Sequence, residues 1–198
     1  LPGVSATSFG PNASRPVLRG FQGDRVRVLT DGIGSLDVSN TSVDHAVSIN
    51  PLTAERIEVL RGPGALLFGS AAIGGVVNVI DARIPRRIPD EAVHAAGILT
   101  YGSAADERSA NAVVDIPIGG NFVLHVDGNY TRTDDLEIGG FALTPELRAE
   151  AAASASPEIR ELSELRGRLP NTAARTWEAA AGFAWIDGQN NVGFSISR

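Results

Sequence analysis

An aspartate and a histidine stand side by side at Asp44 and His45, within the segment SVDHAV. Imidazole nitrogen and carboxylate oxygen together suit Zn(II) and other borderline divalent ions. Two adjacent side chains do not complete a tetrahedral site, so further ligands would have to come from other parts of the protein. The pair is therefore a candidate metal site. The alternative is that both residues are ordinary solvated loop residues.

Other chemistry-bearing patterns point away from catalysis. The segment Gly64–Ser70 has the glycine spacing of a phosphate-binding loop, but Ser70 stands where that loop needs a lysine to reach the phosphates. Only three histidines occur, at 45, 94 and 125, and none stands in a recognisable order with a nucleophile and a carboxylate. We therefore expect neither an enzyme nor a catalytic cofactor.

The composition excludes several further classes. The chain of 198 residues has a net charge of -6, no lysine and no basic cluster, which gives no reason to expect nucleic acid as a partner. Because it has no cysteine, it can form neither a disulfide scaffold nor a thiolate metal site. No run approaches the roughly 18 apolar residues of a membrane-spanning helix.

The segments that would position polar side chains in a site are predicted to be long strands with two different faces. From 122 to 131, apolar residues alternate with mostly polar ones, and the polar set includes His125 and Asp127. Residues 177–185 alternate in the same way, with Trp177, Phe183 and Trp185 on one face. This pattern is typical of barrel strands with lipid outside and water inside. A soluble antiparallel sheet with one wet face gives the same alternation.

Strands are expected near 93–102, 108–118, 122–134, 175–186 and 192–198, joined by short turns at 119–121 and 187–191. Residues 135–174 form a long connection between two of these strands. Its Ala- and Glu-rich part, Pro145–Leu165, favours helix, and Pro157 should interrupt or restart that helix. Barrels have short periplasmic turns and long outer loops, so we interpret 135–174 as an extracellular loop.

Residues 56–80, RIEVLRGPGALLFGSAAIGGVVNVI, combine two short apolar strands with a Gly- and Pro-containing loop and a paired glycine. Residues 15–35, RPVLRGFQGDRVRVLTDGIGS, precede them with a strand, a turn and a second strand. Together these stretches resemble the plug-domain signature of TonB-dependent outer-membrane transporters. The resemblance implies an α+β plug at 1–88, followed at 89–198 by about five antiparallel strands of a plugged transmembrane β-barrel of about 22 strands.

The chain is therefore expected to be a fragment of a longer receptor in the bacterial outer membrane. The signal peptide and the segment that contacts the energy-coupling protein should precede Leu1. The resemblance also implies the partners: a periplasmic TonB protein, outer-membrane lipid, and a metal ion or metal chelate as cargo.

The plug resembles the zinc-receptor branch of this family, which makes Zn(II) the first expectation for the transported ligand, with Asp44 and His45 near its route. His125 and Asp127, on the lumen face, would be secondary ion contacts or simply polar groups lining the wall. Import of a ferric siderophore or haem by the same machine is the second interpretation. A soluble β-rich binding module is the third.

Charged residues of the plug are candidates for docking it to the barrel wall, because buried charges need partners. The candidates are Arg15, Arg19, Arg56, Glu58 and Arg61. Glu58 and Arg61 in particular are predicted to lock the plug sheet to the wall. The alternative is that these residues form a solvated strand face.

Overall fold

The computed structural model describes residues 1–7, 14–34 and 54–198. Its contacts divide the chain into two compact units. The first comprises Leu1–Ile98, Ala110–Tyr130 and Trp177–Arg198, and the second comprises Leu99–Ser109 and Thr131–Thr176.

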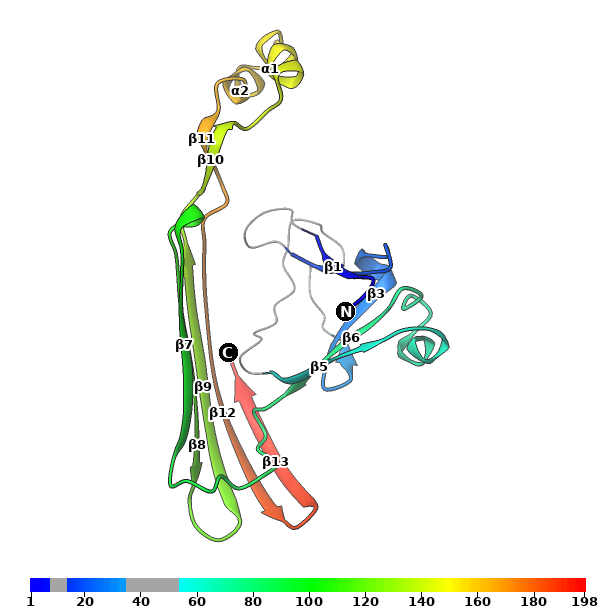
Figure 1. Cartoon of the computed structure of the whole chain (residues 1–198), viewed down its shortest axis with the longest axis vertical. Helices are drawn as coiled ribbons and strands as arrows, with labels where there is room; N and C mark the ends of the chain where they lie inside the picture. Colours follow the sequence, from blue (N-terminus) through cyan, green and yellow to red (C-terminus); the bar gives the residue numbers. More distant parts are fainter. Residues whose placement is uncertain (8–13, 35–53) are drawn as a thin grey trace. The chain divides into compact units, whose positions relative to one another are not determined.

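A mixed four-stranded sheet organises the N-terminal part of the first unit (Figure 1). Its order is β4 (Ile33–Gly34), β3 (Val26–Thr30), β6 (Gly75–Asp81) and β5 (Ala54–Leu60), with β3 parallel and β5 antiparallel to β6. Strand β6 reads GVVNVID and is buried along its length up to Asp81. A near-continuous apolar run of this kind is typical of a strand covered on both faces.

Two small apolar clusters cover opposite faces of β6. Val76 packs with Leu29 and with Ala65 of a 3-10 helix, Pro63–Phe68. Val77 packs with Leu18 of strand β2 (Pro16–Leu18), which pairs with β1 (Val4–Ala6). A short 3-10 turn at Gly23–Arg25 leads into β3. Because successive side chains of a strand point to opposite faces, β6 packs against the 3-10 helix on one face and against the β1–β2 ribbon on the other.

The paired glycine at the start of β6, Gly74 and Gly75, is needed because other chain segments approach it closely. A Cβ on Gly74 would lie 2.4 Å from Phe21 Cβ and 2.8 Å from the Arg25 carbonyl oxygen. Gly75 has φ 134°, and its Cβ would lie 2.7 Å from the Leu60 carbonyl oxygen. The glycines in this part of the signature therefore serve packing as well as turn geometry.

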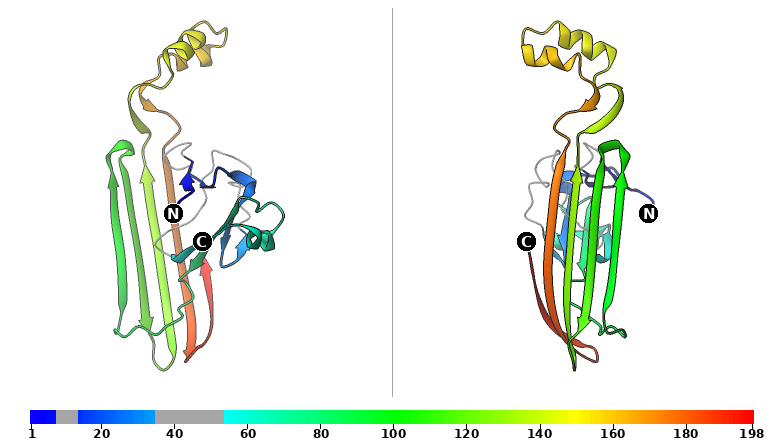
Figure 2. Two further views of the ribbon diagram at one scale, coloured as in Figure 1. Left: turned by 45° about the vertical axis from the view of Figure 1, so that its right-hand side comes forward. Right: turned by 90° about the vertical axis from the view of Figure 1, so that its left-hand side faces the viewer.

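Five long strands form the second sheet, in the order β13-β12-β9-β8-β7 (Figures 1 and 2). They are β7 (His94–Gly102), β8 (Glu107–Pro117), β9 (Phe122–Thr133), β12 (Ala174–Asp187) and β13 (Asn190–Ser197), with a 3-10 turn at Ser103–Ala105 between the first two. Strands β12 and β13 pair antiparallel from Ala180↔Ser197 to Asp187↔Asn190. Each strand expected in this part of the sequence is present. The division of the chain at 88/89 stays a prediction.

The connection from β9 to β12 has structure of its own and makes up most of the second unit. Strands β10 (Leu136–Phe141) and β11 (Arg166–Leu169) form a ribbon that carries helices α1 (Pro145–Ala152) and α2 (Pro157–Leu162). Pro157 occupies the first turn of α2, which confirms that it restarts the helix. Within the described part of the chain, neither helix is long and apolar enough to cross a membrane. The extracellular position of this loop stays a prediction.

Candidate functional site

The segment that leaves the plug sheet passes directly onto the polar face of the five-stranded sheet. Arg83, two residues beyond the end of β6, makes the central contact. Its Nε lies 3.2 Å from Asp127 Oδ2 on β9, and its Nη2 donates to a carboxylate oxygen of Glu178 on β12. The Asp127 side chain is fully buried and that of Arg83 is 12% exposed. One guanidinium therefore bridges two wall strands in a poorly solvated place.

His125 extends this network along the same face of β9. Its Nδ1 lies 2.7 Å from Asp115 Oδ1 on β8, and its Nε2 lies 3.2 Å from Asp127 Oδ2. A neutral imidazole can donate to only one of these carboxylates, whereas an imidazolium donates to both. Asn129 donates to the second oxygen of Glu178 at 3.1 Å. The result is a continuous chain of polar contacts across β8, β9 and β12.

The end of β6 adds a further carboxylate to this site. The Asp81 side chain accepts from the Arg83 backbone N–H and lies 3.6 Å from the Arg83 guanidinium. Burial raises the pKa of Asp81, and the nearby charges of Asp31 and Asp127 act in the same direction, while the contacts with Arg83 lower it. Burial lowers the pKa of Arg83, but the carboxylates of Glu178 and Asp127 more than offset this, so the net shift is upward. Arg83 is therefore held in its charged form.

Gly182 on β12 provides the space in which this segment lies against the wall. A Cβ built on Gly182 would stand 1.7 Å from the Arg83 carbonyl oxygen and 3.5 Å from His125 Cβ. Next along the chain, Ile84 packs against a buried apolar cluster of the wall, made up of Val123, Ala184 and Ile186. We call Arg83 and Ile84, together with the wall residues that they contact, the connector anchor.

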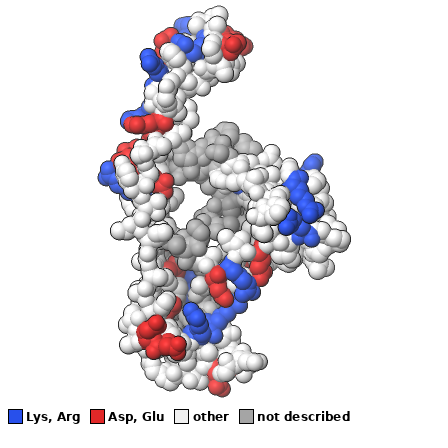
Figure 3. Space-filling model, in the orientation of Figure 1, with Lys and Arg blue, Asp and Glu red and all other residues white. Residues whose placement is uncertain are grey.

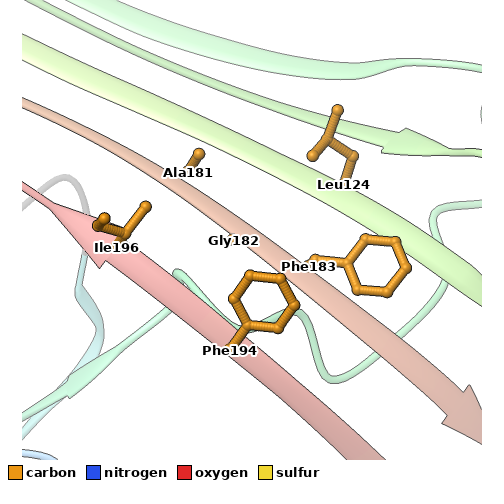
Figure 4. A pocket seen from close by; sticks show the side chains of 6 residues that line it. All are labelled: Leu124, Ala181, Gly182, Phe183, Phe194 and Ile196. Carbon is orange, nitrogen blue, oxygen red and sulfur yellow. The ribbon is translucent and has the colours of Figure 1, made fainter.

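The opposite face of the five-stranded sheet is apolar. Leu124, Phe183, Phe194 and Ile196, from three neighbouring strands, surround a shallow hollow of about 320 Å³ (Figure 4). The ring centroids of Phe183 and Phe194 lie 5.9 Å apart, and Phe194 remains 67% exposed. In the space-filling view, most of the surface along the five long strands is uncharged (Figure 3). The predicted alternation is thus confirmed, with His125 and Asp127 on the buried polar face.

The predicted docking residues have their described partners within the plug. Arg56 Nε lies 2.9 Å from Glu58 Oε1, and Glu58 also accepts from Asn78 at 3.3 Å. Arg61 donates to the Pro2 carbonyl oxygen at 2.8 Å.

Arg15 and Arg19 also contact plug residues in the described part. The Arg15 backbone N–H donates to Thr7 Oγ1, and the backbone N–H of Arg19, which has φ 51°, donates to the Gly3 carbonyl oxygen. A role for any of the five in docking to the rest of a barrel stays a prediction.

The metal-site prediction falls outside the structure, because Asp44 and His45 do not belong to the described residues. In the described ranges, no group of three or more His, Asp or Glu side chains could hold a metal ion. Asp127 binds Arg83 and His125, and His125 also contacts Asp115. A contact of His125 or Asp127 with a passing ion stays a prediction.

Sequence reasoning did not single out Arg83 or Gly182. One signal was available: Asp127 and Glu178 stand on the inward face of predicted wall strands, where buried carboxylates need a cation. The sequence offers many arginines for that role, and their spacing along the chain does not tell which one reaches the wall.

The first part of the chain matches a known domain family. Residues 1–76 match the model of the TonB-dependent Receptor Plug Domain. This chain carries a TonB-dependent receptor plug. A plug of the receptor type agrees with the prediction that the protein is not an enzyme.

Curated relatives extend the likeness beyond the plug. The iron-regulated outer membrane virulence protein of Vibrio cholerae is 32% identical over 182 residues, covering 81% of this chain and 28% of the relative. The hemin receptor of Yersinia enterocolitica is 34% identical over 142 residues, covering 69% of this chain and 18% of the relative. The chain thus spans less than a third of the length of these two relatives. The plug and these relatives place it in the outer membrane.

Solved structures show the same fold at low sequence identity. The copper transporter OprC has a TM-score of 0.66 at 20% identity, over 99% of this chain and 26% of that one. The FrpB iron transporter of Neisseria meningitidis has a TM-score of 0.65 at 15% identity, over 99% of this chain and 27% of that one. A plug domain followed by antiparallel barrel strands is thereby confirmed as the fold class. Assignment to a zinc-receptor branch stays a prediction.

Proposed function

We propose that this chain is the plug and first wall segment of an energy-coupled importer that brings an iron chelate, either a ferric siderophore or haem, across the outer membrane. The observation that carries the proposal is a TonB-dependent receptor plug whose chain continues onto the polar face of a sheet with an apolar outer face. Relatives named for iron regulation and for hemin support the cargo class.

The proposed mechanism needs no covalent chemistry. A chelate binds on the outer side of the plug, and a periplasmic TonB protein pulls on the plug to open a path. The arrangement suits a movable gate because the plug sheet is small and, among the described residues, its ion pairs with the wall lie at the short connector after β6. A small sheet that is held at one place can rearrange at lower free energy than a sheet that shares a continuous apolar core with the wall.

Zinc is the second candidate cargo, and the adjacent Asp44 and His45 in the sequence favour it. A soluble binding module finds less support. Val192, Phe194 and Ile196 are each at least two-thirds exposed on one face of β13, and a soluble protein would have to cover such a stripe. Outer-membrane lipid covers it in the proposed importer.

Uptake by cells that carry the full-length receptor tests the proposal. Radioactive iron supplied as a siderophore chelate, radioactive haem and radioactive zinc are each offered with and without a protonophore. Energy-dependent uptake of an iron chelate or haem supports the proposal. Uptake of zinc alone, lost in an Asp44→Ala, His45→Ala double variant and kept in a His94→Ala control, would replace it with the zinc importer.

A further inference from the structure

At the connector anchor, two connector residues contact several residues of the wall, and the covalent link between plug and wall does not by itself require these contacts. Arg83 reaches Asp127 and Glu178, while Ile84 enters the cluster of Val123 and Ala184. These residues come from three separate stretches of the sequence. The anchor is therefore a tertiary contact that can be kept or broken independently of the covalent link between plug and wall.

The polar half of this contact is costly to open. The Asp127 side chain is fully buried and that of Glu178 is 31% exposed. The Arg83 guanidinium contacts both carboxylates. Among the described residues, withdrawing Arg83 would leave only His125 beside the Asp127 carboxylate and only Asn129 beside the Glu178 carboxylate. A buried carboxylate that loses its ion-pair partner keeps its full desolvation penalty.

The backbone half of the contact depends on shape. Strand β12 has no side chain at position 182, and the Arg83 carbonyl occupies the space that a Cβ would need. One residue later, Ile84 continues the contact against the apolar cluster that includes Ala184 of the same strand. The connector thus combines a close backbone approach, an apolar contact and a bridging guanidinium within two successive residues.

The plug sheet upstream of this point is joined differently. The described hydrogen-bond partners of the Arg56, Glu58 and Arg61 side chains all lie within the plug. In the described part of the chain, the buried ion pairs between plug-derived and wall residues therefore gather at Arg83.

We infer that the connector anchor is a fixed point of the gate: Arg83 holds the chain to β9 and β12 throughout transport, and the plug rearranges only upstream of Asp81. This inference rests on the proposed import function for its gating step. In this arrangement, Arg83 acts as a positioning residue, because it keeps the plug tethered to one side of the wall while force from the periplasm is applied elsewhere. The plug then returns to the same seat after each cycle.

A cysteine reporter at Ile84 tests whether the anchor stays closed. The 198 residues contain no cysteine, so Ile84→Cys in a full-length receptor freed of any other cysteines is a unique thiol. The reporter is labelled with N-ethylmaleimide in intact cells, with and without a protonophore and with and without the iron chelate. We expect slow labelling in all four conditions. Faster labelling in energised cells that contain the chelate would overturn the inference.

Arg83→Met in the reporter background tests what holds the anchor closed. We expect labelling to become about tenfold faster, which corresponds to a tenfold decrease in the equilibrium constant for closing of the anchor. The matched control is Arg86→Met, three residues further along the connector. The Arg86 side chain is 52% exposed and comes no closer than 3.9 Å to a carboxylate of the described residues. Equal labelling of the Arg83 and Arg86 variants would overturn the role of Arg83.

Glu178→Gln provides a milder variant in case Arg83→Met fails to assemble. It leaves Asp127 in place, so an intermediate labelling rate is expected, and a rate equal to that of the parent would count against the bridge. Uptake is measured in the same cells. If the receptor that carries only the Ile84→Cys reporter shows no energy-dependent uptake, the proposed function is refuted. The labelling rates in unenergised cells still decide whether Arg83 keeps the anchor closed.

Discussion

Adding one methyl group at Gly182 should open the connector anchor. The Cβ of Gly182→Ala would meet the Arg83 carbonyl oxygen at 1.7 Å, and an ordinary contact begins near 3.4 Å. The connector backbone must therefore move away by about 1.7 Å. A shift of this size would carry the Arg83 guanidinium, now 3.2 Å from Asp127, beyond ion-pair distance unless its side chain adjusts.

The expected cost follows from these two effects. Overpacking of a close contact costs about 1–3 kcal/mol. Loss of one partner of a buried ion pair costs about 3–5 kcal/mol. If the flexible Arg83 side chain keeps its carboxylates, only the first cost applies, so we expect a destabilisation of at least about 1–3 kcal/mol.

Thermal unfolding of the purified full-length receptor in detergent measures this effect, with protease sensitivity of the plug as a second readout. Gly128→Ala on the neighbouring strand is the control, because its Cβ would meet only the Glu178 carbonyl oxygen, at 3.4 Å. We expect Gly182→Ala to unfold at a clearly lower temperature and its plug to be cleaved faster. Equal behaviour of the two variants would refute the packing argument.

Three further predictions concern the plug and the loop. Gly75→Ala should destabilise the plug by about 2–4 kcal/mol, because it adds strain at φ 134° to a close backbone contact. Gly64→Ala is the control and should leave the plug stable, because no described atom lies within 4 Å of the added Cβ. Proteolysis of the plug measures both variants. The hydrogen bond from Arg56, and then that from Asn78, lowers the pKa of Glu58, so its contribution to stability is present above the ordinary carboxyl pKa and is lost as pH falls through the folded pKa. The stability difference between the parent and Glu58→Gln should accordingly vanish in acid, and a difference independent of pH would contradict this. Thr144→Ala removes the side chain that caps α1 and should cost that helix about 0.5–2 kcal/mol, seen as faster amide exchange in α1 and not in α2, which has no side-chain cap bond.

The strands and turns were largely predictable from the sequence because their signals are local. The alternation around His125 and Asp127 depends only on the period of a strand, and the two faces appear in the structure as expected. Pro157 restarts a helix because proline lacks an N–H, which is again a property of the residue itself. The plug signature at 56–80 also belongs to this local class.

The candidate site was predicted less completely. The polar face of β9 was expected, but the partner of its carboxylates was not, because Arg83 lies 44 positions from Asp127 and 95 from Glu178 along the chain. Glu58 and Arg61 were expected to reach the wall, and in the described part their partners are in the plug. Nothing in the local pattern separates one arginine from another.

By itself the sequence determined the family signature, the strand periods, the turn glycines and the absence of thiol chemistry, since each depends on residue type and short-range spacing. Only the tertiary structure decided which cation compensates the inward carboxylates and why position 182 has no side chain. Both depend on where the chain returns after a long connection, and a close approach of two backbones leaves no trace in the spacing of residues. The connector anchor is therefore a product of the fold, built from residues that look ordinary in the sequence.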